Sequence, residues 1–160
     1  CSTNGFFVWI AEPGAVFAAA HRVIKPGGHY VFYDVHPFQR PWKDQTALEM
    51  AEPYFETGPL MDETPAQRTY EFHWTLSDLI NPLPAVGLRL RRIAESPAGD
   101  SRFWRDHSYR SGTDATPADS RQNPRAGLPV WLTVAAAKDP EEAEEPKSDG
   151  GDRRGGEGGQ

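Results

Sequence analysis

The first clear hydrophobic pattern covers residues 13 to 25. Apolar side chains recur there at the spacing of one helix face, at Val16, Phe17, Ala20, Val23 and Ile24. Pro13 suits the first turn of a helix, and the sequence Lys25-Pro26-Gly27-Gly28 stops the helix and turns the chain. We therefore predict a helix over residues 13–25, followed by a tight turn.

The next pattern, over residues 29–35, is almost continuously apolar and rich in aromatic and β-branched residues. Such a run predicts a strand buried on both faces, and it ends at His36-Pro37, where proline cannot donate to a neighbouring strand. A helix, a glycine turn and a buried strand make the second half of a β-α-β unit. We expect the first strand of that unit to lie before Cys1.

The middle of the chain predicts less regular structure. Residues 37–68 are proline-rich and are expected to be irregular, whereas residues 68–74 are expected to be extended. The sequence Thr75-Leu76-Ser77-Asp78 is typical of a capped helix start. Pro82 and Pro84 should keep this helix short.

Two further strands are predicted, over residues 88–95 and 128–137. In the first, apolar and basic residues alternate, which favours a strand with one solvated face. A long polar loop over residues 97–127 is expected to join them. This order of elements indicates an α/β fold.

Composition separates the last residues from the rest. Residues 139–160 hold eight acidic and three basic residues with six glycines, so they carry −5 of the total charge of −6. They cannot bury enough apolar surface to offset chain entropy, so we expect a disordered acidic, glycine-rich tail after one domain over residues 1–138. Since that domain is nearly neutral and has no basic stripe, nucleic acid is not an expected partner.

Targeting and redox signals are few. Cys1 is the only cysteine, so no disulfide within the chain is possible. No apolar run is long enough to span a bilayer and no signal peptide is visible, so we expect no membrane partner. These features predict a cytoplasmic protein.

The segment His21-Arg22-Val23-Ile24-Lys25-Pro26-Gly27-Gly28, followed by an aromatic strand, resembles a signature of class I S-adenosylmethionine-dependent methyltransferases. In that family a helix ending in Arg-Val-Leu-Lys-Pro-Gly-Gly precedes the fifth strand, and here Ile24 replaces the leucine. Residues 34–38 resemble the end of the fifth strand in one bacterial branch, and residues 127–134 resemble the final strand. The resemblance covers residues 1–138.

The resemblance implies a partial Rossmann-like methyltransferase sheet with flanking helices, made of strands 5, 7 and 6 of the family order 3-2-1-4-5-7-6. The final strand should run antiparallel between the other two. The family's Asp/Glu-x-Gly-x-Gly cofactor loop has no counterpart in residues 1–138, nor does the acidic residue that holds the ribose. On this interpretation the N-terminal half of the enzyme is absent. Residues 2–10 resemble the loop after its fourth strand, and residues 1–5 come just after that missing strand.

Open α/β sheets bind ligands at the carboxyl ends of their parallel strands. The resemblance therefore implies that the methionine part and sulfonium of the cofactor, S-adenosyl-L-methionine, lie near Ser2, Thr3, Asn4 and Gly5. The alternative is that these residues only cap the segment that follows. His36 is the candidate catalytic residue, because a histidine that titrates near neutral pH suits a general base. The alternative for His36 is a strand-end ring satisfied by backbone groups, with Asp34 as a structural hydrogen-bond partner.

A dry cavity with aromatic walls suits a cationic sulfonium, so aromatic and polar residues are candidates for holding a small-molecule methyl acceptor. The predicted acceptor-binding residues are Trp9, Asp34, His36, Phe38, Trp42, Tyr54 and His73. Phe55 and Trp74 are further aromatic candidates. Ordinary core packing is the alternative, and for Trp9 and Trp74 it is the preferred one.

No metal site is expected, because the five histidines have no ligand spacing with cysteine or carboxylates. The predicted function is S-adenosylmethionine-dependent methyl transfer to a small molecule, which needs the absent N-terminal half. The alternative is a non-catalytic remnant of such an enzyme that acts as an interaction module. A nucleotide-dependent oxidoreductase fits the order of segments less well.

Overall fold

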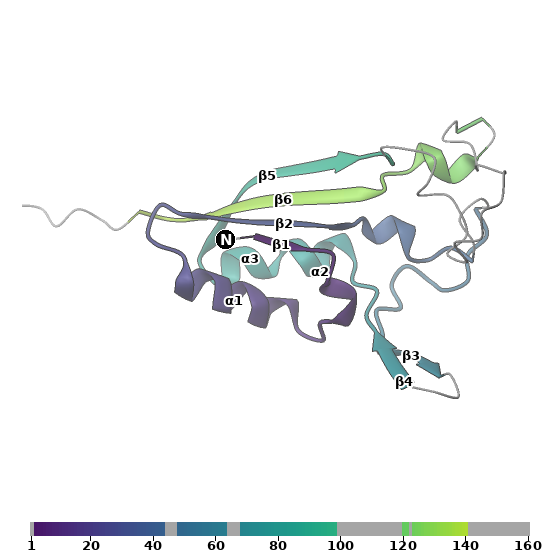
Figure 1. The fold of residues 1–160 in the computed structure, drawn as a ribbon, viewed down its shortest axis with the longest axis horizontal. Coiled ribbons are helices and arrows are strands. Elements are labelled where there is room, and N and C mark those ends of the chain that lie inside the picture. The colour runs from purple at the N-terminus through teal and green to yellow at the C-terminus, as the bar shows by residue number, and fades with distance from the viewer. Residues whose placement is uncertain (1, 44–47, 64–67, 99–119, 122, 141–160) are drawn as a thin grey trace, which may run out of the picture.

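The larger sheet of the protein has four strands in the order β1-β2-β6-β5 (Figure 1). They are β1 (Ser2–Asn4), β2 (His29–Val35), β6 (Trp131–Lys138) and β5 (Leu88–Ser96). The structure, a computed structural model, describes residues 2–43, 48–63, 68–98, 120–121 and 123–140.

The last strand, β6, lies between β2 and β5 and runs antiparallel to both. Its pairing with β2 extends from His29 opposite Ala137 to Val35 opposite Trp131. Because both neighbours run against β6, β2 and β5 are parallel to each other. This arrangement confirms the predicted place and direction of the final strand.

Residues 2–4 form a strand rather than the predicted loop. β1 runs parallel to β2, with Ser2 opposite Val31 and Asn4 opposite Tyr33. Residues 2–4 therefore belong to the first strand of the β-α-β unit, and the prediction that this strand lies entirely before Cys1 was wrong. Thr3 favours a strand but Asn4 does not, and pairing with β2 decides the conformation by giving hydrogen bonds to their backbone.

Three helices lie on one side of the sheet (Figure 1), namely α1 (Pro13–Val23), α2 (Leu76–Ile80) and α3 (Pro82–Ala85). The core forms between these helices and the sheet, and it includes Phe17, Leu83, Tyr30, Phe32, Leu132 and Val134. Burial alternates along β2, so Phe32 is buried while Tyr33 is 36% exposed and stacks on Trp131. The described residues thus cover one face of β2, and the predicted burial of both faces was wrong, because aromatic residues favour strands whichever face they occupy.

The capped helix start is confirmed. The Thr75 side chain accepts a hydrogen bond from the Asp78 N–H, and the Asp78 carboxylate accepts one from the Thr75 N–H. α2 then ends at Ile80, and α3 begins at Pro82, which has no N–H to donate to the preceding turn. A β-hairpin precedes α2, formed by β3 (Leu60–Glu63) and β4 (Arg68–Glu71). β4 confirms the predicted extended segment, whereas β3 lies in a region predicted to be irregular.

Short 3-10 turns join the other elements. They are η1 (Phe7–Trp9) after β1, η2 (Pro37–Gln39) after β2 and η4 (Pro124–Gly127) before β6. Most of the predicted 97–127 loop and of the predicted disordered tail lies outside the described residues. Within the described part of the chain, no helix has the length and apolar character needed to cross a membrane.

Candidate functional site

The candidate site lies where the parallel strands β1 and β2 end. Asp34, near the end of β2, is buried, and one of its carboxylate oxygens accepts hydrogen bonds from the N–H groups of Phe6 (3.1 Å) and Phe7 (3.0 Å). Its other oxygen accepts from the Val35 N–H at 2.7 Å. Three backbone donors thus satisfy the charge of this carboxylate, and they tie the chain after β1 to the end of β2.

Of the four predicted cofactor-binding residues, Thr3 and Gly5 make hydrogen bonds to β2. The Thr3 hydroxyl lies 2.7 Å from the Tyr30 hydroxyl, so this side chain bonds within the fold. Gly5 ends β1 with φ of +61°, and its N–H donates to the Tyr33 carbonyl at 2.8 Å. A Cβ built on Gly5 would meet no atom of the described protein within 4 Å. Ser2 and Asn4 flank Thr3 in β1.

This geometry fits one end of a cofactor and not the whole of it. Gly5 leaves open space at the carboxyl end of β1, where its backbone is free of side-chain cover. The glycine-rich loop and the ribose-binding acid that the family uses have no counterpart in residues 1–138. The residues present could therefore contact only the portion of S-adenosylmethionine that reaches the end of β1.

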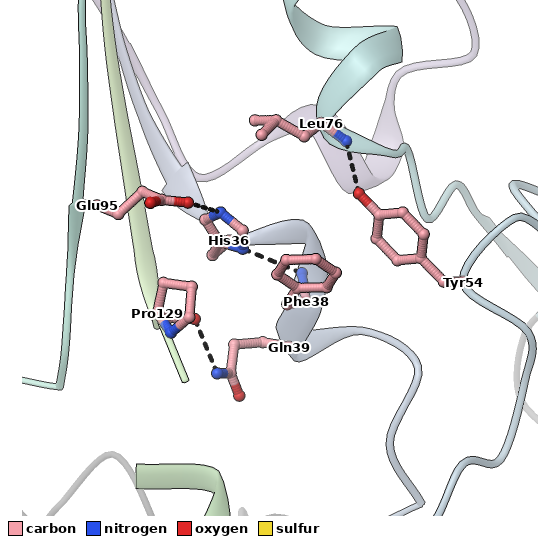
Figure 2. A network of polar contacts seen from close by, with 7 residues as sticks. All are labelled: His36, Phe38, Gln39, Tyr54, Leu76, Glu95 and Pro129. Carbon is pink, nitrogen blue, oxygen red and sulfur yellow. Dashed lines mark hydrogen bonds and ion pairs between the residues drawn. The ribbon is translucent and has the colours of Figure 1, made fainter. Parts of the chain in front are cut away.

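His36, the candidate catalytic residue, is fully buried and uses both ring nitrogens. Its Nδ1 accepts the Phe38 N–H at 3.1 Å, so the proton of the neutral ring lies on Nε2. Nε2 then donates to the Glu95 carboxylate of β5 at 2.8 Å (Figure 2). Burial lowers the pKa of His36, and the hydrogen bond and charge of Glu95 oppose that decrease.

Three of the aromatic residues that were predicted to bind the acceptor lie around this histidine. Phe38 stacks on the His36 ring at a centroid distance of 5.3 Å and lies 5.0 Å from the Tyr54 ring. The Tyr54 hydroxyl accepts the Leu76 N–H at 2.9 Å, which joins the cluster to the start of α2 (Figure 2). The Trp42 indole N–H donates to the Phe38 carbonyl. The structure thus brings His36, Phe38, Tyr54 and Trp42 together.

Two other predicted residues have different partners or surroundings. The His73 ring lies between two carboxylates, with Nδ1 3.5 Å from Glu52 and Nε2 3.5 Å from Glu71. Trp9, in η1, is 54% exposed, so it is not part of the core. Of the further aromatic candidates, Phe55 is exposed, whereas Trp74 donates its indole N–H to the Ile10 carbonyl at 2.8 Å.

A narrow pocket opens beside Asp34, at the ends of β1 and β2. Its walls are mostly apolar, and they include Phe7, Val8, Phe72 and Trp74. Arg40 also lines this pocket, and sequence reasoning did not select it. Its position four residues after His36, in the segment His36-Pro37-Phe38-Gln39-Arg40, was the available signal, since residues just beyond a parallel strand often contact ligands.

Burial lowers the pKa of the Arg40 guanidinium, and the negative charges of Asp34 and Glu71 oppose this decrease. The guanidinium therefore interacts electrostatically with these two carboxylates. Within the described residues, no group of three or more His, Cys, Asp or Glu side chains is arranged to hold a metal ion.

Comparisons with known proteins support the fold. No protein-family model matches the sequence, and neither does any curated protein. One similar solved structure is a Listeria monocytogenes protein classed as an S-adenosylmethionine dependent methyltransferase. Its TM-score is 0.57 and its sequence identity 16%, and the match covers 86% of this chain and 59% of the Listeria chain. A Mesorhizobium loti S-adenosylmethionine dependent methyltransferase gives a TM-score of 0.50 and 16% identity, over 86% and 60%.

The chain spans less than two thirds of the length of either solved structure. Within that span, the strand order β1-β2-β6-β5 and the antiparallel β6 agree with the resemblance seen in the sequence. The chain therefore has part of the class I S-adenosylmethionine-dependent methyltransferase fold.

Proposed function

We propose that this chain is the acceptor-side part of an S-adenosylmethionine-dependent methyltransferase that acts on a small molecule. One observation carries the proposal: Asp34 joins the segment after β1 to the end of β2 through its hydrogen bonds to Phe6 and Phe7. Two parallel strands thus end together, at the edge where open α/β sheets bind ligands. The similar solved structures support a methyl-transfer fold without identifying an acceptor.

The residues of this chain would act mainly by positioning. S-adenosylmethionine, when bound, supplies the methyl group, and the open backbone at Gly5 suits the approach of its methionine end. Phe38, Tyr54 and Trp42 would form an aromatic wall that excludes water from the acceptor. Holding two reactants in line is a large part of catalysis for a transfer of this kind.

His36 remains the proposed general base, provided that one of its ring nitrogens becomes free to accept a proton. In the arrangement described, its Nδ1 lone pair already accepts the Phe38 N–H. The ring could take a proton from an acceptor only after that hydrogen bond breaks. Until then His36 holds the turn after β2 in place.

The coding sequence upstream of Cys1 provides the first test. The proposal expects an in-frame strand–turn–helix with the glycine-rich cofactor loop, and the protein with that extension should bind S-adenosylmethionine. Absence of such a segment would contradict the proposal and favour the non-catalytic interaction module.

A matched pair of variants then tests the position of the cofactor in the extended protein. Gly5→Val places a branched side chain where the ligand is proposed, and S-adenosylmethionine affinity should fall about tenfold or more. Gly27→Val is the control, because Gly27 also has positive φ (+76°) and open space, but lies at the other end of β2. Equal losses in the two variants would contradict the proposed position.

A further inference from the structure

A groove lies where α3 leads into β5, the strand at one edge of the larger sheet (Figure 1). Its volume of about 440 Å³ falls in the range of pockets that take small ligands. The outer edge of β5 pairs with no other strand among the described residues. The groove lining is mostly apolar and includes Ile80, Pro84, Leu88 and Leu90, with Arg89 and Asp139 as its charged residues.

The exposed part of β5 concentrates positive charge. Arg89, Arg91 and Arg92 are all exposed and lie within four consecutive positions. Among the residues that the structure describes, none forms a hydrogen bond or an ion pair with the side chain of Arg91 or Arg92. Residues 139–160 carry −5 of the total charge of −6, so residues 1–138 carry only −1 and these arginines are a local feature. A positive strand edge of this kind attracts an acidic segment.

One carboxylate already lies at this groove. Asp139 follows the last residue of β6, and its side chain forms an ion pair with Arg89 at 2.6 Å. The Gly27 N–H donates to the Asp139 carbonyl at 3.3 Å, and Lys25, two residues before Gly27, is exposed. The carboxylate nevertheless pairs with β5 rather than with this lysine. The chain therefore reaches the end of its described part, at Pro140, with the preceding acidic side chain turned toward β5.

The sequence that follows is complementary to the strand in charge. Residues 141–145, which lie beyond the described part, read Glu-Glu-Ala-Glu-Glu and include no basic residue. Five extended residues span at most about 18 Å. The distance along β5 from Arg89 to Arg92 is about 10 Å at the rise of a strand. A segment that starts after Pro140 can therefore place its carboxylates beside Arg91 and Arg92.

A second copy of the chain fits this edge less well. Two β5 strands side by side would bring their arginines together, and like charges opposite each other destabilise a strand pair. The edge still needs a cover, because Leu90 and Ile93 are 38% and 41% exposed and an open apolar strand tends to pair with other chains. An acidic segment satisfies both conditions, since it neutralises the arginines and occupies the edge.

We propose that the acidic segment 141–145 binds the arginines of β5 in the same chain and covers the groove and the open edge of the strand. Its tether to β6 gives it an effective concentration of about millimolar, so exposed ion pairs that are weak one by one suffice for contact. The contact is electrostatic, so it weakens as salt is added. Any other acidic or extended partner has to displace this segment before it reaches β5.

The test uses the full chain with a nitroxide spin label in the tail. Ser148→Cys carries the label, and Cys1→Ser removes the native thiol. The label broadens the signals of nearby amide protons, so nuclear magnetic resonance reports which residues the tail approaches. At low salt the signals of residues 89–93 should broaden most, and the broadening should lessen at about 0.5 M salt, where exposed charges are screened.

A neutral tail separates charge from tethering. The control variant replaces Glu141, Glu142, Glu144 and Glu145 by glutamine, which keeps the length of the tail and removes the charge of the segment. The broadening that remains in this variant is the contribution of the tether alone. The acidic tail should broaden the signals of residues 91–93 at least about twofold more, because its ion pairs hold it at the strand for longer.

Variants of the strand test the other side of the contact. Arg91→Gln combined with Arg92→Gln should reduce the broadening to the level of the neutral tail. Lys43→Gln combined with Arg68→Gln removes the same charge at exposed positions outside β5, so this matched control should broaden as the wild type does. The neutral-tail variant leaves the sequence of the described fold unchanged, and it serves if the strand variant does not fold.

Three results would overturn the inference. The first is equal broadening with the acidic and the neutral tail, and the second is broadening centred on Lys25 and the end of α1. The third is a dependence of the β5 signals on protein concentration, which would assign the edge to a second copy. None of these results bears on methyl transfer, so this inference and the proposed function are tested separately.

Discussion

The His36 ring and the Glu95 carboxylate lie 2.8 Å apart, although 59 residues separate them in the sequence. The contact crosses β6, because Asp34 of β2 and Glu95 of β5 both pair with Leu132. His36 is fully buried, whereas the Glu95 side chain is 50% exposed. The pair thus joins the end of β2 to the edge strand β5. The imidazole of this pair is neutral and donates from Nε2.

This pair predicts a dependence of stability on pH. Burial lowers the pKa of His36 below its usual 6.5 in the folded protein. As pH falls below 6.5, the unfolded chain takes up a proton that the folded chain does not, so the free energy of unfolding should decrease. His36→Gln should make this decrease smaller. Urea unfolding at several pH values below 6.5 measures the free energy of unfolding of both proteins. If this free energy changes with pH by the same amount in the wild type and in His36→Gln, the prediction is contradicted.

Asp34→Asn should destabilise the protein by about 1 to 3 kcal/mol, because an amide cannot accept all three backbone N–H groups. Urea unfolding at neutral pH gives the difference in free energy. Glu12→Gln is the matched control, since Glu12 is exposed and its side chain makes no capping hydrogen bond. It should change stability by no more than about 0.5 kcal/mol. Similar losses in both variants would show that Asp34 acts only through charge.

The two glycines of the turn before β2 predict different costs. A Cβ on Gly28 would lie 2.7 Å from the Ile24 Cγ2 and 2.8 Å from the Lys25 carbonyl oxygen, so Gly28→Ala forces the turn to shift. Gly27 has φ of +76° and open space, so Gly27→Ala brings only backbone strain of about 1 kcal/mol. Thermal unfolding should therefore show the larger loss in Gly28→Ala. The reverse order would mean that the turn adapts easily at Gly28.

The chain by itself is predicted to bind S-adenosylmethionine with a Kd no tighter than about 1 mM, because the glycine-rich loop is not in residues 1–138. Isothermal titration calorimetry measures this affinity directly. We also expect marginal stability, since β1 leaves one edge unpaired within the described sheet. Micromolar binding by this chain alone would contradict the view that the cofactor needs a further segment.

Much of the fold follows from patterns that are local in the sequence. The spacing of apolar residues from 13 to 25, the Gly27-Gly28 turn and the Thr75–Asp78 cap each depend on residues a few positions apart, and the structure contains all three. The central position of the last strand followed from resemblance to a known order of segments. Sequence reasoning also selected His36, Phe38, Trp42 and Tyr54, which do lie together.

Only the tertiary structure decided the rest. The polar residues of β1 became a strand because β2 offered hydrogen bonds to their backbone. The partners of His36 and Asp34, and the pocket around Arg40, join residues that are far apart in the chain. Local periodicity and capping reflect energies between near neighbours, whereas a charged side chain acquires its role from whichever distant groups the packed sheet and helices bring beside it.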